Sequence, residues 1–287
     1  MKIRIGTRKS NLAMAQTYLV RDAILAVEPA AQIELVALST KGDKILDKPL
    51  LSFGGKGVFV EEFESKIKNG EIDIAVHSAK DMPMELLDGL TILAVLKRED
   101  PRDVLVTRKG TSWDRDRHFV IGTSSLRRKM QIARFGDVEC RELRGNVNTR
   151  LRKLEEGQYD GIILAMAGLK RLGLDKDPEF SLTPFSCEEF IPAGGQGIIA
   201  IEGRKSSELN GLFQKLEDKS ARYELLFERK VLQCLNAGCH EPIGVFSKVE
   251  GDEITGYLMK ENKIQKVKGP KDSYEDLAQT LSKKGTV

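Results

Sequence analysis

The chain has 287 residues, of which 40% are apolar and 31% charged, and its formal net charge at pH 7 is +3. This is the composition of an ordinary globular protein, and it excludes an intrinsically disordered or fibrous chain. The modest net charge gives no reason to expect a nucleic acid or a membrane surface as partner. The length predicts two or three domains.

The N-terminus and the cysteines indicate the compartment. Residues 1–6 alternate like a strand and lack the apolar run of a secretory signal. No segment approaches the roughly 18 apolar residues of a membrane-spanning helix. The four cysteines, Cys140, Cys187, Cys234 and Cys239, are widely spaced, which argues against a disulfide framework. We therefore expect free thiols and a cytoplasmic protein.

The first third of the chain alternates strands with helices. Residues 3–6 are predicted to form a strand, and the apolar spacing from Leu12 to Ala26 predicts a helix that Pro29 ends. The elements predicted after it are a strand at 33–38, a helix at 58–68 and strands at 72–76 and 90–96. The order favours a largely parallel sheet with helices on its faces.

A second unit repeats the plan of the first. The string Ile121-Gly122-Thr123 matches the opening Ile5-Gly6-Thr7, and each string is followed by polar residues and a helix. Residues 98–102 interrupt the pattern, so we expect the chain to cross from one lobe to the other near residue 98. The elements predicted in the second unit are strands at 104–106, 120–123, 138–143 and 161–165 and helices at 126–135 and 148–156.

The last part of the chain predicts a small α+β domain. The predicted elements are helices at 208–216 and 221–235, strands at 245–249, 254–259 and 264–267, and a final helix at 274–281. The fold class is therefore α/β, with two similar lobes and a C-terminal domain built on a three-stranded antiparallel sheet. The expected domains are residues 1–97, 98–196 and 218–287.

Segments that follow the predicted strands should line a cleft between the lobes, because ligands of open parallel sheets lie beyond the carboxyl ends of the strands. These segments are residues 7–10, 78–81, 123–128 and 144–146. Residues 118–152 contain eight Lys or Arg against three acids, and guanidinium groups match carboxylates or phosphates. We expect an anionic ligand there. For the arginines the alternative is a solvated helix face, and for Ser10, Ser124 and Ser125 it is helix capping.

Asp81 directly follows an apolar strand and is next to Lys80. Such a carboxylate can stabilise a developing cation or relay protons, although a structural role in a turn is an equal alternative. His77, within the strand, is expected to be a packed residue and not a ligand.

Cys239 follows a glycine that should end a helix, so its sulfur is expected in an accessible loop. Zinc binding by Cys234, Cys239 and His240 is the alternative, but their spacing matches no structural zinc pattern and a fourth ligand is missing. We therefore expect no metal. The glycine-rich residues 54–57 lack the spacing of a nucleotide phosphate loop.

Ten short strings carry a family resemblance. They are GTRKS (6–10), KGD (41–43), GGKG (54–57), HSAKD (77–81), REDPRD (98–103), GTSSLRR (122–128), LRGNV (143–147), AGLKRLG (167–173), PAGGQG (192–197) and GC (238–239). In this order they closely resemble the porphobilinogen deaminase family. The resemblance implies a cytoplasmic and usually monomeric enzyme, with two lobes arranged as in periplasmic binding proteins and with residues 197–217 completing the first domain.

The resemblance also implies the reaction and its cofactor. A dipyrromethane, made from the enzyme's own substrate, is bound through a thioether to Cys239. Porphobilinogen loses ammonia, the resulting azafulvene is attacked by the free end of the growing chain, and four cycles precede release of hydroxymethylbilane. Each pyrrole carries acetate and propionate groups, which explains a need for several arginines.

Individual roles are carried over from the same resemblance. Asp81 is the implied catalytic group, facing the pyrrole nitrogens. The implied cofactor-binding residues are Cys239, Lys80, Asp81, Thr123, Ser125, Arg127, Arg128, Arg144 and Gly145. The implied substrate-binding residues are Arg8, Ser10, Ser78, Arg150, Arg171 and Gln196. The chain departs from the family pattern at Ser52, where relatives often carry a lysine.

Two other functions remain open from the residues alone. A two-lobed binding protein for an organic anion has the same fold without chemistry. RNA binding by residues 118–152 is the other, but Phe119 and Phe135 are the only aromatic residues there, and stacking platforms supply much of the affinity for single strands.

Overall fold

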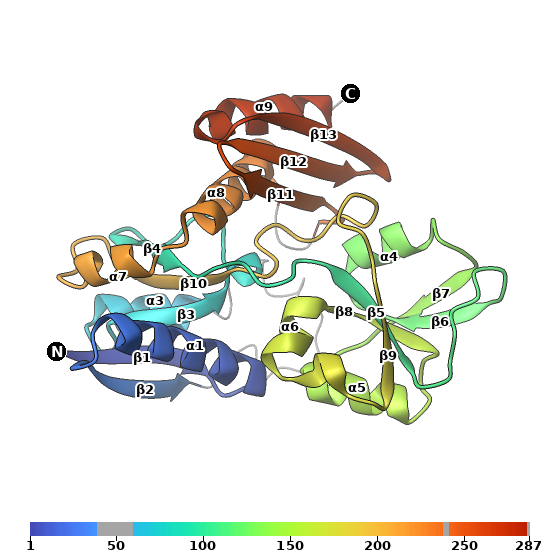
Figure 1. The fold of residues 1–287 in the computed structure, drawn as a ribbon, viewed down its shortest axis with the longest axis horizontal. Helices are drawn as coiled ribbons and strands as arrows, with labels where there is room; N and C mark the ends of the chain where they lie inside the picture. The colour runs from blue at the N-terminus through green and yellow to red at the C-terminus, as the bar shows by residue number, and fades with distance from the viewer. Residues whose placement is uncertain (39–59, 238–240, 286–287) are drawn as a thin grey trace.

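The computed structural model describes residues 1–38, 60–237 and 241–285. These residues form two α/β lobes and a smaller C-terminal domain (Figure 1). The predicted fold class is thereby confirmed. Within the described part of the chain, every helix is too short or too polar to cross a bilayer.

The first lobe contains a five-stranded sheet. Its strands, in spatial order, are β2 (Gln32–Leu38), β1 (Lys2–Arg8), β3 (Ile74–Ser78), β10 (Ile199–Arg204) and β4 (Leu90–Val95). Strand β10 is antiparallel to both neighbours, whereas β1, β2 and β3 are mutually parallel. The helices of this lobe are α1 (Asn11–Val27), α3 (Glu61–Lys68) and α7 (Asn210–Leu216).

Burial explains why the first strand and helix form where they do. Ile3 and Ile5 alternate along β1 and are fully buried, and they share a core cluster with Val20 and Ile24 of α1. The strand period of two and the helical period near four thus turn both apolar faces toward each other.

The second lobe repeats this topology. Its strands, in spatial order, are β7 (Val138–Arg141), β6 (Phe119–Gly122), β8 (Gly161–Ala165), β5 (Asp103–Arg108) and β9 (Phe180–Pro184). Its helices are α4 (Leu126–Ile132), α5 (Val147–Glu155) and α6 (Met166–Arg171). Strand β5 is the antiparallel one here and occupies the place that β10 has in the first lobe.

The chain passes twice between the lobes, through residues 96–102 and 185–198, which we call the first and second crossing segments. They are in contact, because the Glu99 amide donates to the Gly197 carbonyl oxygen at 3.1 Å, and the Leu96 amide donates to the carbonyl oxygen of Ile199, the first residue of β10, at 3.1 Å. The first crossing segment lies where the interruption near residue 98 predicted it.

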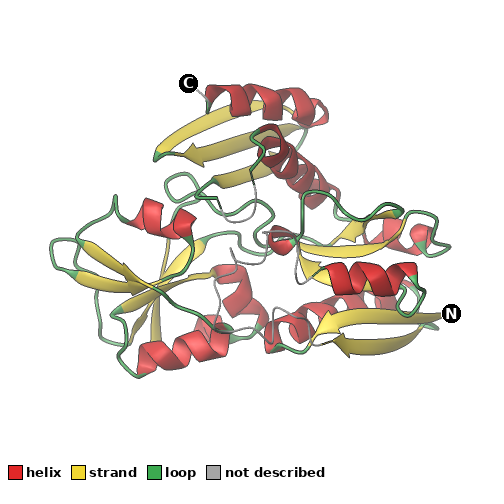
Figure 2. Cartoon of the chain, turned by 180° about the vertical axis from the view of Figure 1, so that it is seen from behind, coloured by secondary structure: helices red, strands yellow, loops and turns green. Residues whose placement is uncertain are grey.

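The C-terminal domain is a meander covered by helices. Its elements are α8 (Lys219–Cys234), β11 (Gly244–Glu250), β12 (Glu253–Lys260), β13 (Lys263–Pro270) and α9 (Tyr274–Lys284). Seen from behind, α9 lies along the sheet and α8 lies on the side of the first lobe (Figure 2). Phe227 and Val231 of α8 pack with Leu281 of α9 in one buried cluster.

Several predicted boundaries are wrong. The helix predicted at 126–135 ends at Ile132. The helix predicted at 58–68 begins at Glu61, and residues 58 and 59 lie outside the described part. Helix α6 and strand β9 were not predicted, because α6 is short and β9 is mostly exposed and ends at Pro184.

Candidate active site where the lobes meet

A single turn after β3 presents three of the predicted site residues. Ser78 ends the strand, and residues Ala79–Asp81 form a 3-10 turn, η2. Ala79 is buried at 3% exposure, and its amide donates to the carbonyl oxygen of Ile198 at 3.0 Å. This packing fixes the turn against the second crossing segment and leaves the Asp81 side chain exposed.

The charges around Asp81 come from both lobes. Lys80 is next to it, and burial lowers the pKa of Lys80 to about 8, with Arg128 and Arg127 also lowering it and Asp81 and Asp103 opposing the shift. In the second lobe, burial lowers the pKa of Arg150 to about 10, with Arg128 adding to the effect and Asp81 opposing it. Asp81 therefore lies within electrostatic reach of cations on both lobes.

A buried aspartate holds two of the predicted arginines. Asp103, at the start of β5, is fully buried. It accepts from Arg127 Nη1 at 2.7 Å and from Arg128 Nη2 at 2.7 Å and Nε at 3.1 Å. Burial alone would raise the pKa of Asp103, but the two guanidinium groups hold it well below its usual range. Both arginines are thus fixed in place at the start of α4.

The two arginines also bind backbone. Arg127 Nη1 donates to the carbonyl oxygen of Ile191 and Arg128 Nη1 to that of Ile163, each at 2.7 Å. Arg127 is 4% exposed and Arg128 is 7% exposed. The alternative of a solvated helix face is wrong for these two arginines.

The serines of the two Gly-Thr loops act differently. Ser10 caps α1 by accepting from the Ala13 amide at 3.3 Å, and Ser125 caps α4 by accepting from the Arg128 amide at 3.4 Å. Ser124 instead donates to the Leu143 carbonyl oxygen at 2.9 Å and accepts from the Leu143 amide at 3.1 Å. Capping therefore accounts for two of the three hydroxyls, and Ser124 ties its loop to the segment after β7.

The loop before α5 carries the next predicted residues. Arg150 Nε donates to the Gly145 carbonyl oxygen at 2.8 Å, which turns the side chain back along the loop. Arg144 is more exposed, with its Nε 4.0 Å from Glu142 Oε2. Thr123 is buried at 2% exposure and its Oγ1 accepts from the Ser125 amide at 3.2 Å.

Two further predicted substrate-binding residues, Arg171 and Ser78, lie on opposite lobes. Arg171, at the end of α6, donates through Nη2 to the Gly197 carbonyl oxygen, and burial lowers its pKa to about 10. The Ser78 hydroxyl accepts from Gln16 Nε2 of α1 at 2.8 Å. Arg8 ends β1 and is half-buried.

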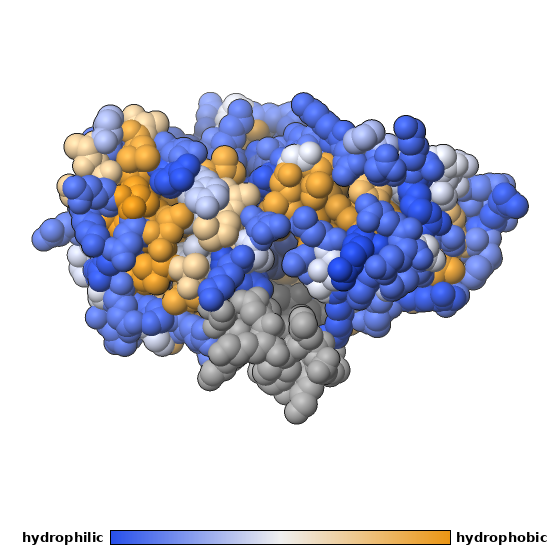
Figure 3. All heavy atoms as spheres, turned by 90° about the horizontal axis from the view of Figure 1, so that it is seen from below, coloured by the Kyte–Doolittle hydropathy of each residue, from blue (hydrophilic) through white to orange (hydrophobic). Residues whose placement is uncertain are grey.

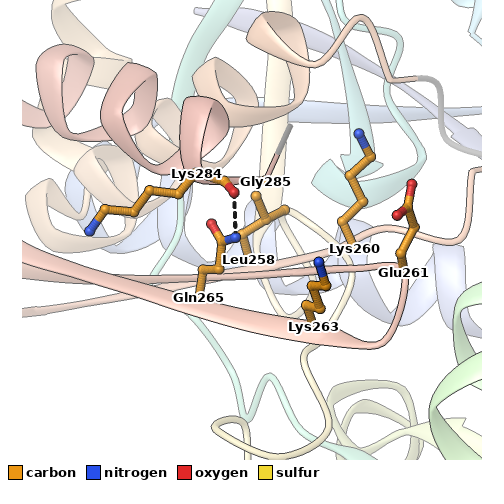
Figure 4. Close-up of a pocket in the computed structure, with 7 residues that line it drawn as sticks. All are labelled: Leu258, Lys260, Glu261, Lys263, Gln265, Lys284 and Gly285. Carbon is orange, nitrogen blue, oxygen red and sulfur yellow. Dashed lines mark hydrogen bonds between the residues drawn. The ribbon is translucent and has the colours of Figure 1, made fainter. Parts of the chain in front are cut away.

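Cavities elsewhere do not contain these residues. One, of about 80 Å³, lies in the C-terminal domain beside the β12–β13 hairpin and the end of α9 (Figure 4). There Gln265 Nε2 donates to the Lys284 carbonyl oxygen at 2.5 Å. A wider one, of about 490 Å³, lies between the segment Met84–Ile92 and α8. The first is far smaller than sites for drug-sized ligands, and neither is lined by a predicted site residue.

The surface away from the C-terminal domain is mostly hydrophilic (Figure 3). Hydrophobic residues gather in one area on the side of the first lobe and in another near the middle. The large exposed apolar side chains of the described residues include Tyr18 and Leu19 of α1.

Sequence comparisons identify the family. The family model described as porphobilinogen deaminase, dipyromethane cofactor binding domain, matches residues 3–210. The model of the porphobilinogen deaminase C-terminal domain matches residues 222–284. The chain belongs to the porphobilinogen deaminase family. The resemblance seen in the ten strings is thus confirmed.

Relatives in this family are similar over nearly the whole chain. The porphobilinogen deaminase of Acetivibrio thermocellus is 44% identical over 98% of this chain and 97% of its own length. The probable porphobilinogen deaminase of Archaeoglobus fulgidus is 43% identical over 87% of this chain and 85% of its own. Among solved structures, the periplasmic VFT2 domain of BvgS from Bordetella pertussis is 14% identical, with a TM-score of 0.44, and the match covers 75% of this chain and 86% of that chain.

The residues of the candidate site fit a dipyrromethane, the cofactor named in the family model. A dipyrromethane offers carboxylates and pyrrole N–H groups, and the site offers Lys80, Arg128 and Arg150 for the former and the exposed Asp81 carboxylate for the latter. The predicted anchor, Cys239, lies outside the described residues, as do His240, Ser52 and the glycine-rich residues 54–57. Within the described ranges, no cluster of three or more His, Cys, Asp or Glu could hold a metal ion.

Sequence reasoning missed Asp103 and Gln16. Asp103 ends the string REDPRD (98–103), but the sequence did not predict its ion pairs, because Arg127 and Arg128 lie 24 and 25 residues further along the chain. Gln16 is on the buried side of α1, where a polar residue among apolar positions was the available signal. His77 is packed as predicted, with its Nε2 2.9 Å from Glu202 Oε2.

A second missed cluster joins the C-terminal domain to the crossing segments. Arg98 Nη1 donates to Glu228 Oε1 of α8 at 2.7 Å. Glu228 Oε2 accepts from the Gly195 amide at 2.6 Å, and Oε1 accepts from the Ser247 amide at 2.7 Å. One buried carboxylate thus contacts both crossing segments and β11.

Proposed function

We propose that Asp81 is the catalytic group with which this hydroxymethylbilane synthase joins four porphobilinogen molecules head to tail, with release of ammonia, for tetrapyrrole biosynthesis. The observation that supports this role is the position of Asp81, exposed after β3 and within reach of Lys80 and of Arg150 from the other lobe. A carboxylate there faces a cationic intermediate with a fixed negative charge.

The cations serve the carboxylates of the substrate and of the growing chain. We assign substrate contacts to Arg8, Ser10, Ser78, Arg150, Arg171 and Gln196. We assign cofactor contacts to Lys80, Asp81, Thr123, Ser125, Arg127, Arg128, Arg144 and Gly145. Burial lowers the pKa of Arg150 and of Arg171 to about 10, so both remain positively charged at neutral pH.

Asp81 acts by charge and by hydrogen bonding. Loss of ammonia from porphobilinogen leaves a cationic ring, and the Asp81 carboxylate stabilises that charge while it accepts from the pyrrole N–H. Lys80, with a pKa of about 8, is mostly protonated at neutral pH and binds a carboxylate beside it. The loss of its proton above pH 8 would weaken this binding.

Cys239 is the proposed anchor of the dipyrromethane cofactor. When bound, this group supplies the free pyrrole carbon to which the first substrate is joined. In sequence Cys239 follows α8 and precedes β11, and α8 is tied to both crossing segments through Glu228. A tether from this domain is compatible with a chain that grows between the lobes.

The domain limits, the monomeric state and the cytoplasmic location belong to the same proposal. The first domain comprises residues 1–97 and 197–217, the second 98–196 and the third 218–287. The inclusion of 197–217 is supported by β10, which pairs with β3 and β4 in the sheet of the first lobe.

Intact-mass analysis tests the anchor. The wild-type protein should weigh one dipyrrole more than its sequence, and it should redden with an aldehyde reagent for pyrroles. Cys239→Ser should lack this added mass, whereas Cys234→Ser, which removes an exposed thiol five positions earlier, should keep it. An unmodified mass in an actively polymerising wild-type preparation would overturn the assignment, and saturable binding without turnover would favour an anion-binding protein.

A further inference from the structure

Gln196 is a buried amide in the second crossing segment, placed between the two lobes. It is 1% exposed. Its Oε1 accepts from Lys80 Nζ of the first lobe at 3.3 Å. Its Nε2 donates to Asp103 Oδ1 of the second lobe at 3.0 Å and to the Pro101 carbonyl oxygen of the first crossing segment at 2.7 Å.

These contacts use both hydrogens of the amide. A glutamine nitrogen has two hydrogens, and here each has an acceptor. The amide accepts from an ammonium group at one end and donates to a carboxylate at the other. The side chain is therefore engaged with protein groups of both lobes, and the expectation that it contacts the substrate stays a prediction.

The backbone around Gln196 is built for this close approach. Gly195 and Gly197 have φ angles of +77° and +89°, which side-chain-bearing residues rarely adopt. A Cβ on Gly197 would lie 2.3 Å from the Glu99 carbonyl oxygen, and one on Gly195 would lie 3.0 Å from the backbone of Ala79 and Lys80. The two glycines let the segment lie against η2 and the first crossing segment together.

Asp103 extends the connection to the arginines. The oxygen that accepts from Gln196, Oδ1, also accepts from Arg128, and Oδ2 accepts from Arg127. A continuous set of hydrogen bonds thus runs from Lys80 through Gln196 and Asp103 to both guanidinium groups. We call this set the Gln196 link.

We propose that Gln196 is a positioning residue, which holds Lys80 of the first lobe in register with the Asp103–Arg127–Arg128 cluster of the second lobe. The inference rests on the proposed function, in which Lys80 and the two arginines bind ligand carboxylates. Gln196 would contribute to that binding indirectly, by holding Lys80 and Asp103 in place. The charged groups that face Lys80 are Asp81, Asp103, Arg127 and Arg128. Gln196 adds the neutral acceptor that stabilises the ammonium form.

The test measures the protonation of Lys80 directly in the holoenzyme. Competitive labelling with acetic anhydride over a range of pH, read peptide by peptide by mass spectrometry, reports the fraction of free amine. Gln196→Met keeps the approximate side-chain volume and removes the acceptor of Lys80. Loss of one ordinary hydrogen bond to the ammonium form should increase the fraction of free amine, so Lys80 should react about twofold to tenfold faster near neutral pH. Lys271, paired with Asp252 in the C-terminal domain, is the internal control and should not change.

Gln196→Glu is the matched variant. Its side chain keeps an oxygen acceptor for Lys80 whether it is ionised or protonated, so labelling of Lys80 should be equal to or slower than in the wild type. The proposal requires the order Met variant fastest, then wild type, then Glu variant equal or slower. An unchanged rate in the Met variant, or faster labelling in both variants, would overturn it.

Activity profiles separate this inference from the proposed function. In the Met variant the decline of turnover at basic pH should begin at lower pH than in the wild type. If labelling shifts as expected while the activity profile does not, the Gln196 link stands and the proposed role of the Lys80 charge fails. If neither shifts, the link fails and the proposed role of Asp81 is unaffected.

Discussion

The two lobes have the same strand order but contribute different chemistry. In the first lobe, the turn after β3 exposes a carboxylate, Asp81. In the second lobe, the carboxylate of Asp103 is completely buried and binds Arg127 and Arg128. The comparison teaches that the same strand order can present one aspartate exposed beyond a strand end and can bury another against two guanidinium groups.

Removing the exposed acid should have the largest effect. Asp81→Asn keeps the shape but loses the negative charge, so kcat should fall about 100-fold to 10,000-fold. Steady-state assays of pyrrole consumption measure this, and intact mass should show that the cofactor is retained. Asp88→Asn, an exposed aspartate seven positions later, is the control and should leave kcat unchanged. Near-normal turnover in Asp81→Asn would remove Asp81 from the mechanism.

Removing the buried acid should reduce stability instead. Asp103→Asn leaves two buried guanidinium groups without their counter-charge, which should lower the free energy of unfolding by about 3–5 kcal/mol. Urea denaturation measures the change. Asp252→Asn, which breaks an exposed pair with Lys271, should have a much smaller effect, and equal effects would contradict the distinction between the two aspartates.

The same substitution should change the response to acid. Because the folded pKa of Asp103 is depressed, its stabilisation is complete above its unfolded pKa, near 4, and is lost as the pH falls below that value. Denaturation at several pH values between 5 and 2 should show a steeper loss of stability in the wild type than in Asp103→Asn. Parallel curves would contradict the assignment of this titration to Asp103.

The helix caps offer the smallest and most symmetrical comparison. Ser10→Ala and Ser125→Ala remove corresponding caps from α1 and α4, and each should cost about 1 kcal/mol of stability. Thermal unfolding checks both. Because Ser10 is assigned to the substrate and Ser125 to the cofactor, Ser10→Ala should raise KM more than Ser125→Ala does, and an equal change in KM for both variants would contradict that difference.

Much of the fold follows from local patterns, and the remainder depends on long-range pairing. The apolar periods of β1, α1 and the C-terminal meander predicted those elements, and the repeated Ile-Gly-Thr string predicted the second lobe. Strand β10 pairs with β3 at Ile201–Val76, a partnership that no local period encodes. Strand β9 is exposed at an edge and gives a weak alternating pattern.

In the candidate site, the residue types and their places after strands could be predicted, but their long-range partners could not. Arg127 and Arg128 were expected beyond a strand end because of their residue type and place. Their anchoring by Asp103 was not, since a buried aspartate at the start of a strand has no signature before its partners converge. Gln196 was expected to bind the substrate because of the family resemblance, but its hydrogen bonds with Lys80 and Asp103 have no local signal in the sequence.

The central claim is that Asp81 of the first lobe and the cations of the second lobe act at one site, and a double-mutant cycle tests it most directly. The cycle compares kcat/KM for Asp81→Asn, Arg150→Gln and the combined variant. If the residues act together, the loss in the combined variant should differ from the sum of the single losses by more than about 0.5 kcal/mol. Strictly additive losses would mean that the two residues act independently and would contradict the account.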